Sequence, residues 1–157
     1  MKWGLSFLMV LFSISVKSQT LCRVYNNKAY GYVDIKGKLI VEYKYDIAFT
    51  DTIESIGFVA TQKGKIVCIN NQGKELFNVF RFDNGPDEIS EGLFRIEADN
   101  GKIGFADTKG NIIIPPVFSF AYPFHNGMAK VTFSGGKRAE YEHYVWVSDK
   151  WFYIVRK

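Results

Sequence analysis

Histidine, which often serves as a general base or a metal ligand, occurs only twice in this 157-residue chain. His125 directly precedes Asn126-Gly127, a pair typical of a tight turn, and His143 lies near the C-terminus. The segment Ser134-Gly135-Gly136-Lys137 lacks the preceding glycine and the following helix of a phosphate-binding loop, so we expect a hairpin tip there. We therefore predict no catalytic, cofactor-binding or metal-binding residues, and a protein that is not an enzyme.

Carboxylates are more numerous, but their spacing indicates loops and turns. Residues 83–88 and Glu91 form an acidic run that offers oxygen ligands of the kind calcium prefers. The run lacks the spacing of a calcium-binding loop and Pro86 interrupts it, so we predict a solvated loop. Asp34 and Asp107 each stand three residues before a glycine, where a carboxylate accepts hydrogen bonds from the amides of its own turn. We assign these two aspartates to turns and not to a catalytic pair.

The two cysteines, Cys22 and Cys68, leave two interpretations open. Both fall on expected strand positions that face a core, which favours two buried thiols. In an oxidising compartment, a disulfide between them is the alternative. No histidine or further cysteine lies at ligand spacing from either thiol, so we do not expect a metal site.

The elements that carry these residues repeat along the chain. Turn glycines recur at intervals of 36 and 37 residues: Gly37, Gly73 and Gly110. A second series, expected to open one strand in each copy, has an interval of 35 residues: Gly57, Gly92 and Gly127. Two landmarks with nearly the same period indicate tandem structural units.

Each unit reads as three strands joined by tight turns. In the best copy the expected strands are residues 92–96, 102–106 and 111–114, and the turns between them contain Asx and Gly. Pro115-Pro116 cannot donate to a ladder, so it is expected to stop the third strand. The predicted fold class is all-β, with tandem β-hairpin repeats of about 36 residues forming a curled antiparallel sheet or a solenoid-like stack. The predicted units span about 21–56, 57–91 and 92–126, and closing hairpins fill 127–157.

The C-terminal end is compatible with two registers. We expect residues 144–147 and 151–155 to pair as a closing hairpin. The alternative aligns residues 151–154 with residues 103–106, which stretches the interval between copies to 48 residues. The first register keeps the hairpin whole and is preferred.

Aromatic residues follow the third strand of a unit and supply the candidate ligand-binding residues. The alternating positions are Tyr43, Tyr45, Phe118, Phe120 and Tyr122. If they face inward they form core, and if they face outward they form a stripe that binds a sugar or a peptide. Their polar tips make Tyr45 and Tyr122 the expected exposed members. Ala48 and Ala121 occupy the same place in two copies, which indicates close packing there.

The N-terminus predicts export. Residues 1–18 combine an early lysine with an apolar run of signal-peptide length, too short for a lasting membrane anchor. Bulky Leu21 before Cys22 argues against the alternative of a lipoprotein. Removal of Lys2 and Lys17 lowers the formal charge from +4 to +2, too little to indicate nucleic-acid binding or an anionic membrane surface. A secreted or periplasmic protein without stable membrane insertion is expected, and residues 19–157 form a single domain.

The repeat resembles the WG-repeat family, whose units follow a pattern such as K-W-G-Y-I-D, a turn glycine and a V-I-P-P stop. Residues 102–116 carry the best match and residues 30–34 the next. The tryptophan of the pattern is Tyr30, Ile66 or Ile103 here, and its glycine is Val67 in the middle copy.

The resemblance implies an all-β repeat structure, commonly exported by bacteria, and it supplies no catalytic residues. We therefore expect an exported, non-enzymatic module without cofactors that binds a protein or a glycan of the cell envelope. A structural or accessory role, with contacts only between neighbouring chains, is the alternative.

Overall fold

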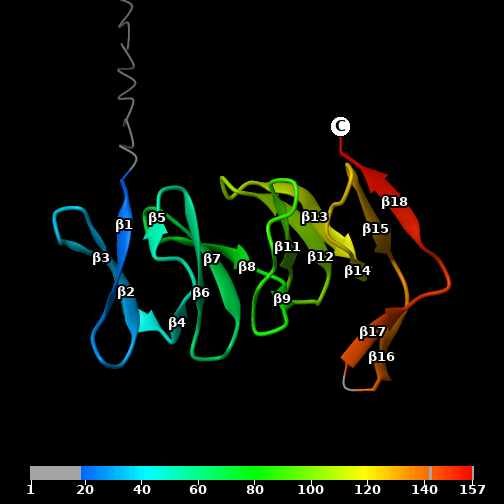
Figure 1. The fold of residues 1–157 in the computed structure, drawn as a ribbon, viewed down its shortest axis with the longest axis horizontal. Coiled ribbons are helices and arrows are strands. Elements are labelled where there is room, and N and C mark those ends of the chain that lie inside the picture. Colours follow the sequence, from blue (N-terminus) through cyan, green and yellow to red (C-terminus); the bar gives the residue numbers. More distant parts are fainter. Residues whose placement is uncertain (1–18, 142, 157) are drawn as a thin grey trace, which may run out of the picture.

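The computed structural model describes residues 19–141 and 143–156, which fold into eighteen strands and no helix. Four antiparallel sheets follow one another along the chain, and they lie side by side in one row from the N-terminus to the C-terminus (Figure 1). The prediction of an all-β fold of tandem repeats is confirmed, and of the two predicted arrangements this one is the solenoid-like stack.

The first two sheets contain four strands each. The first sheet has the order β3-β2-β1-β5, with bounds β1 (Leu21–Tyr25), β2 (Tyr30–Asp34), β3 (Leu39–Tyr45) and β5 (Thr52–Ile53). The second sheet has the order β4-β6-β7-β8, with bounds β4 (Ile47–Ala48), β6 (Ile56–Ala60), β7 (Ile66–Asn70) and β8 (Glu75–Asn78). The short strand β4 follows β3 in the chain but hydrogen-bonds to the second sheet, so it links the two.

The other two sheets contain three strands each. The third sheet comprises β11 (Leu93–Glu97), β12 (Ile103–Asp107) and β13 (Ile112–Phe118), and the last sheet comprises β14 (Phe120–Ala121), β15 (Met128–Thr132) and β18 (Phe152–Val155). Two separate hairpins complete the fold, formed by β9 (Arg81–Phe82) with β10 (Gly85–Pro86) and by β16 (Gly136–Glu140) with β17 (His143–Val147).

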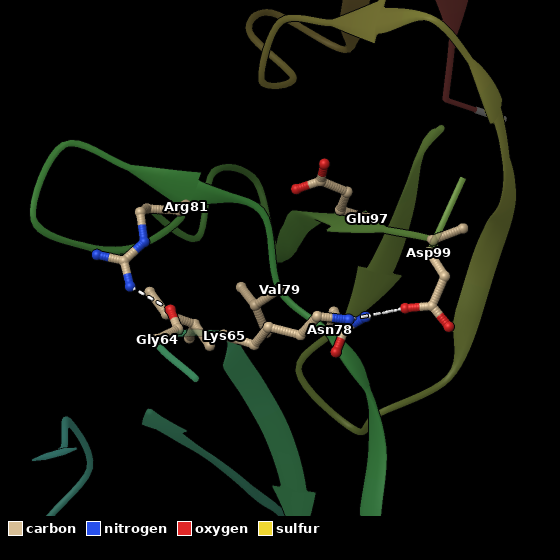
Figure 2. A pocket seen from close by; sticks show the side chains of 9 residues that line it. Gly64, Lys65, Asn78, Val79, Arg81, Glu97 and Asp99 are labelled. Atoms are coloured by element: carbon tan, nitrogen blue, oxygen red, sulfur yellow. Dashed lines mark hydrogen bonds and ion pairs between the residues drawn. The ribbon is translucent and has the colours of Figure 1, made fainter. Parts of the chain in front are cut away.

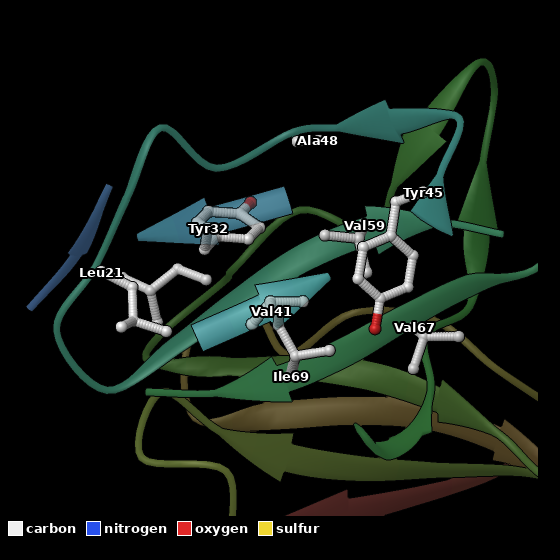
Figure 3. Close-up of a cluster of buried hydrophobic side chains, with 9 residues drawn as sticks. Leu21, Tyr32, Val41, Tyr45, Ala48, Val59, Val67 and Ile69 are labelled. Carbon is white, nitrogen blue, oxygen red and sulfur yellow. The ribbon is translucent and has the colours of Figure 1, made fainter. Parts of the chain in front are cut away.

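Three hydrophobic clusters fill the junctions, by which we mean the packed interfaces between consecutive sheets. At the first junction, Leu21 and Tyr32 of the first sheet meet Val59 and Ile69 of the second (Figure 3). Equivalent clusters join the second sheet to the third and the third to the last. Ala48 and Ala121, from β4 and β14, are both buried in such clusters, which confirms the close packing expected at this position.

The turn glycines are confirmed as structural landmarks. Gly37, Gly73 and Gly110 have φ values of 81°, 77° and 85°, a region that favours glycine. In each turn an Asx side chain accepts two hydrogen bonds from turn amides, at 2.8–3.0 Å, and the residues in this role are Asp34, Asn70 and Asp107. The assignment of Asp34 and Asp107 to turn formation is therefore correct.

The second glycine series is not fully equivalent. Gly92 and Gly127 lie in turns with φ of 75° and 73°, directly before β11 and β15. Gly57 instead lies inside β6 and pairs with Ile69. Since Ile56 pairs with the turn residue Asn70 as Leu93 pairs with Asp107, Ile56 and not Phe58 is the counterpart of Leu93, and the prediction for Gly57 is wrong.

The prediction that Pro115-Pro116 stops the third strand is also wrong. Strand β13 runs through both prolines to Phe118 and bulges there, because Phe105 pairs with Ile114 whereas Ile103 pairs with Phe118. The bulge carries the backbone of β13 across Gly104, where a Cβ would lie 2.4 Å from the Ile114 carbonyl oxygen. The motif glycine therefore makes room for a crossing strand.

The middle copy explains how Val67 replaces this glycine. Strand β8 is short, and Asn78 pairs directly with Val67 without a crossing bulge. The chain then forms the β9–β10 hairpin before it reaches the third sheet. A side chain is accommodated at position 67 because no backbone passes over it.

The preferred closing hairpin is wrong, and the alternative register is correct. Strand β17 pairs with β16, whereas β18 pairs with β15 in the register Met128↔Val155 to Val131↔Phe152. This register reproduces that of β11 with β12, so Phe152 is the counterpart of Gly104. The stretched interval arises because the β16–β17 hairpin is inserted between β15 and β18, where residues 98–102 suffice in the third sheet.

Both cysteines are free thiols, so the disulfide alternative is wrong. Cys68 is buried at the second junction, whereas Cys22 is half-buried on the first sheet. The expected signal peptide, residues 1–18, lies outside the described residues. Within the described part of the chain, no helix has the length and apolar character needed to cross a membrane.

Candidate functional site

The five candidate aromatic residues do not form one stripe. Tyr45 and Phe118 are buried in the clusters of the first and third junctions, and Tyr43 is half-buried on β3. The expected exposure of Tyr45 is wrong, because its ring packs into the core while its hydroxyl group bonds Glu75. The strand break between β13 and β14 separates Phe118 from Phe120 and Tyr122, so alternation does not continue across it.

Phe120 and Tyr122 belong to an aromatic cluster at the last sheet. The Phe120 ring stacks on Trp146 of the inserted hairpin, with centroids 5.3 Å apart and an interplanar angle of 10°. Tyr122 contacts Phe120 at 5.2 Å and Trp151 at 5.6 Å. The Lys130 ammonium group lies 4.6 Å from the centre of the Trp151 ring and 6.0 Å from that of Tyr122. The cluster therefore combines flat rings with a positive charge.

Part of this cluster belongs to a larger apolar surface, which we call the terminal face: Tyr122, Met128, Lys130, Trp151 and Tyr153. Alternate residues of paired strands share one side of a sheet, and Lys130 pairs with Tyr153. The opposite side of the last sheet packs into the third junction through Ala129, Val131 and Ile154. The terminal face is open, since Tyr122, Met128 and Tyr153 are 42%, 43% and 66% exposed.

The same positions are covered in the third sheet. By strand register, Leu93, Arg95 and Phe105 are the counterparts of Met128, Lys130 and Tyr153, and Ile103 is the counterpart of Trp151. All four are buried against the last sheet or its connecting strand. The terminal face therefore presents the kind of surface that another sheet covers elsewhere in the molecule.

Arg95 forms the only ion pair among the described residues whose two side chains are both buried. Its guanidinium group donates to the Asp87 carboxylate at 2.5 and 3.0 Å, and also to the Ala121 carbonyl at 3.0 Å. The prediction of a solvated acidic loop is wrong for Asp87, because the loop after β10 returns this carboxylate to the third sheet.

A polar hollow of about 310 Å³ lies between the turns of the second and third sheets, lined among others by Gly64, Lys65, Asn78, Arg81 and Asp99 (Figure 2). Of the charged residues that line it, Lys65, Arg81 and Asp99 already have partners. Lys65 and Asn78 donate to Asp99 at 2.9 and 3.3 Å, and Arg81 donates to the carbonyl of Gly64. These bonds link neighbouring turns, so we assign them to the structure of the second junction.

A second hollow, of about 500 Å³, adjoins Tyr45 and Glu75. The Tyr45 hydroxyl and the Lys44 ammonium both donate to the Glu75 carboxylate, at 2.7 and 2.9 Å. Burial, and then the hydrogen bond to Glu75, raise the pKa of Tyr45, whereas the hydrogen bonds from Lys44 and Tyr45 lower the pKa of Glu75. These pKa shifts favour a protonated Tyr45 hydroxyl group and an ionised Glu75 carboxylate.

The remaining candidates for chemistry do not assemble. His125 lies in the turn before β15, in the place that Ser90 occupies before β11, as predicted. His143 pairs with Glu140 across the inserted hairpin. Within the described residues, no three histidine, cysteine or acidic side chains are grouped as metal ligands. Burial raises the pKa of the Cys68 thiol to about 12, which disfavours the reactive thiolate.

Sequence reasoning missed Trp146, Trp151 and Lys130 as members of the aromatic cluster. A signal for Trp151 was present, because residues 150–154 read K-W-F-Y-I and match the K-W-G-Y-I of the repeat apart from the glycine. The alternative register used this match, but it was not preferred because it stretches the interval between copies to 48 residues. Nothing local indicated that Trp146, on an inserted hairpin, would stack on Phe120.

Comparison with known proteins agrees with the repeat architecture. The family model described as "WG containing repeat" matches residues 30–65 and 103–137. Neither the curated proteins nor the solved structures include a significant match to the chain.

Proposed function

The chain is a WG-repeat protein, and from that premise we propose that it is an exported, non-catalytic module that binds a protein or a glycan of the bacterial cell envelope. The observation that carries the proposal is the open terminal face, where aromatic rings surround Lys130. Exposed aromatic surface of this kind stacks on sugar rings or packs against apolar side chains.

Two further observations support a binding role. The two hollows contain the ion pairs Lys65–Asp99 and Lys44–Glu75, so these four groups offer less to a ligand than the terminal face. The rings of the aromatic cluster are fixed before any ligand binds. The Trp146 indole donates to the Ser134 carbonyl at 3.0 Å and stacks on Phe120. A preformed aromatic surface loses little conformational entropy on binding.

Export follows from the apolar leader at residues 1–18, and it has its own test. We expect the full chain, expressed in a bacterial host, to reach the envelope or the medium and to begin near Gln19 after processing. Fractionation combined with N-terminal sequencing measures this. Retention of an intact leader in the cytoplasm would contradict export.

The binding test uses the double variant Tyr122→Ala, Trp151→Ala. We expect the purified chain to bind isolated envelope fractions or their polysaccharides, and the variant to bind at least about tenfold more weakly, because two contact rings are lost. The matched control is Tyr25→Ala, Tyr141→Ala, which removes two exposed tyrosines from other surfaces. Equal binding by the wild-type chain and the double variant would remove the terminal face from the proposal.

A further inference from the structure

The three internal junctions share one plan. At the second, Phe58, Ile66 and Cys68 of the second sheet face Phe94, Ile96 and Ala106 of the third. At the third, Leu93, Ile103 and Phe105 of the third sheet face Ala129, Val131 and Ile154 of the last. One side of each sheet therefore supplies the positions that the next sheet covers, and the other side covers the sheet before it.

The two ends of the stack carry the two halves of such a junction. The terminal face is the half that a following sheet would cover. The first sheet carries the complementary half, which we call the first face: Cys22, Val24 and Val33. By strand register these residues are the counterparts of Phe94, Ile96 and Ala106, and they are half-buried instead of buried.

We propose that the partner of the terminal face is a second copy of this chain, whose first sheet stacks on the last sheet as internal sheets stack on one another. The inference rests on the proposed function, because it names the protein partner of the same surface. Each copy would use two different faces, so the contact is head-to-tail and builds rows of molecules instead of a closed two-fold dimer.

The chemistry of the two faces favours this occupant. The terminal face presents large side chains, and the first face presents small and β-branched ones, a size match also found where Phe105 meets Ala129 and Val131. Lys130 replaces the arginine that pairs with Asp51 in the first sheet and with Asp87 in the third. It lies instead over Trp151 and Tyr122, so the contact does not require an acidic partner.

The test uses Tyr153→Cys in the full chain. Cys68 and Phe94 lie in one cluster at the second junction. By strand register, position 153 on the terminal face is the counterpart of Cys68, and Cys22 on the first face is the counterpart of Phe94. Stacking therefore places the introduced thiol beside Cys22 of the next copy. Oxidised glutathione removes two hydrogens from the thiol pair, forms the disulfide and leaves as two molecules of reduced glutathione.

We expect a ladder of dimers and longer oligomers on non-reducing gels, with peptide mapping linking positions 22 and 153 of different copies. Tyr141→Cys places a thiol at the exposed hairpin tip and is the matched control. Adding Cys22→Ser to Tyr153→Cys must abolish species longer than a dimer. A ladder no stronger than that of Tyr141→Cys, or one without the 22–153 link, would overturn the proposal.

A measurement without new cysteines complements the cross-linking. We expect sedimentation velocity to detect concentration-dependent association of the unaltered chain, and Lys130→Glu to weaken it at least about tenfold by burying a carboxylate between apolar faces. A strictly monomeric unaltered chain at high concentration would overturn the inference. If envelope binding still depends on Tyr122 and Trp151 in that case, the proposed function stands and only the self-stacking fails.

Discussion

Leu93 and Phe105 of the third sheet are 3% and 1% exposed, whereas their counterparts Met128 and Tyr153 in the last sheet are 43% and 66% exposed. The residue types are similar and the strand registers are the same. What differs is the neighbour, because the last sheet covers the third and no described segment covers the last. In this fold, whether a side chain at these positions is buried depends on whether a neighbouring sheet covers it, and not on its residue type.

The comparison extends to the basic residue at the centre of each sheet. Arg95 is buried and pairs with Asp87, whereas Lys130 lies over aromatic rings on the terminal face. The two sheets also differ at the position of the motif glycine. In the third sheet this residue is Gly104, and the bulge of β13 passes over it. Its counterpart Phe152 has no third strand beside it, since β18 is an edge of the last sheet.

The largest expected loss of stability comes from breaking the buried ion pair between Arg95 and Asp87. Arg95→Met should lower the free energy of unfolding by about 3–5 kcal/mol, because it leaves the Asp87 carboxylate buried without its guanidinium partner. Lys130→Met should cost less than about 1 kcal/mol, the scale of an exposed cation–π contact. Urea unfolding of both variants measures the difference. Similar losses in the two variants would mean that Lys130 is buried in solution.

An intermediate effect is expected at the glycine. Gly104→Ala adds one methyl group, yet it should cost about 2 kcal/mol, because the new Cβ meets the backbone of Ile114 and Pro116 at 2.4 and 2.6 Å. At the equivalent position, Phe152→Leu should change the free energy of unfolding by less than about 1 kcal/mol. Thermal and urea denaturation test both changes. A neutral Gly104→Ala would show that β13 does not cross so closely.

The smallest expected effect is a loss of stability at alkaline pH that depends on Tyr32. This tyrosine of the first sheet is the counterpart of Phe105 in the third. Burial raises the pKa of Tyr32 to about 12, although the Arg23 charge opposes the shift, and the hydroxyl donates to the Thr50 carbonyl at 2.7 Å. Since the folded pKa exceeds the unfolded value of about 10, this stabilisation is complete below pH 10 and is lost as the pH rises towards 12.

Urea unfolding at pH 9 and pH 11 measures this loss. Tyr32→Phe should lose less stability between the two values than the unaltered chain, and a residual slope is expected because the pKa of Tyr45 is raised as well. Tyr153→Phe, the exposed counterpart, should behave like the unaltered chain. A Tyr32→Phe variant that falls as steeply as the unaltered chain would contradict the assignment.

The period, the strand content and the Asx-glycine turns could be predicted from the sequence, because each depends on contacts within a few residues. Gly37, Gly73 and Gly110 need positive φ whatever surrounds them. Several predictions that depended on tertiary partners failed. Pro115-Pro116 continues its strand because a bulge relieves the missing donors. Asp87, in the loop after β10, is buried because it pairs with Arg95 on β11.

The exposure of the candidate residues could be predicted only in part, for the same reason. Both Tyr45 and Tyr122 were expected to be exposed, because each follows a third strand and has a polar tip. The expectation is correct for Tyr122 and wrong for Tyr45. Tyr45 enters the first junction and finds Glu75 there. Tyr122 faces the side of the last sheet that no described segment covers. The sequence pattern within one repeat unit does not indicate which side of its sheet another sheet covers.

The sequence by itself determined that the chain is an all-β WG-type repeat, because side-chain period and turn chemistry are local properties. The tertiary structure decided which sheet covers which, and hence that Trp151 belongs to the last repeat and meets Tyr122 and Lys130. Strand pairing across an inserted hairpin depends on contacts between residues far apart in the chain. Only the stack shows that its two ends carry matching halves of one junction.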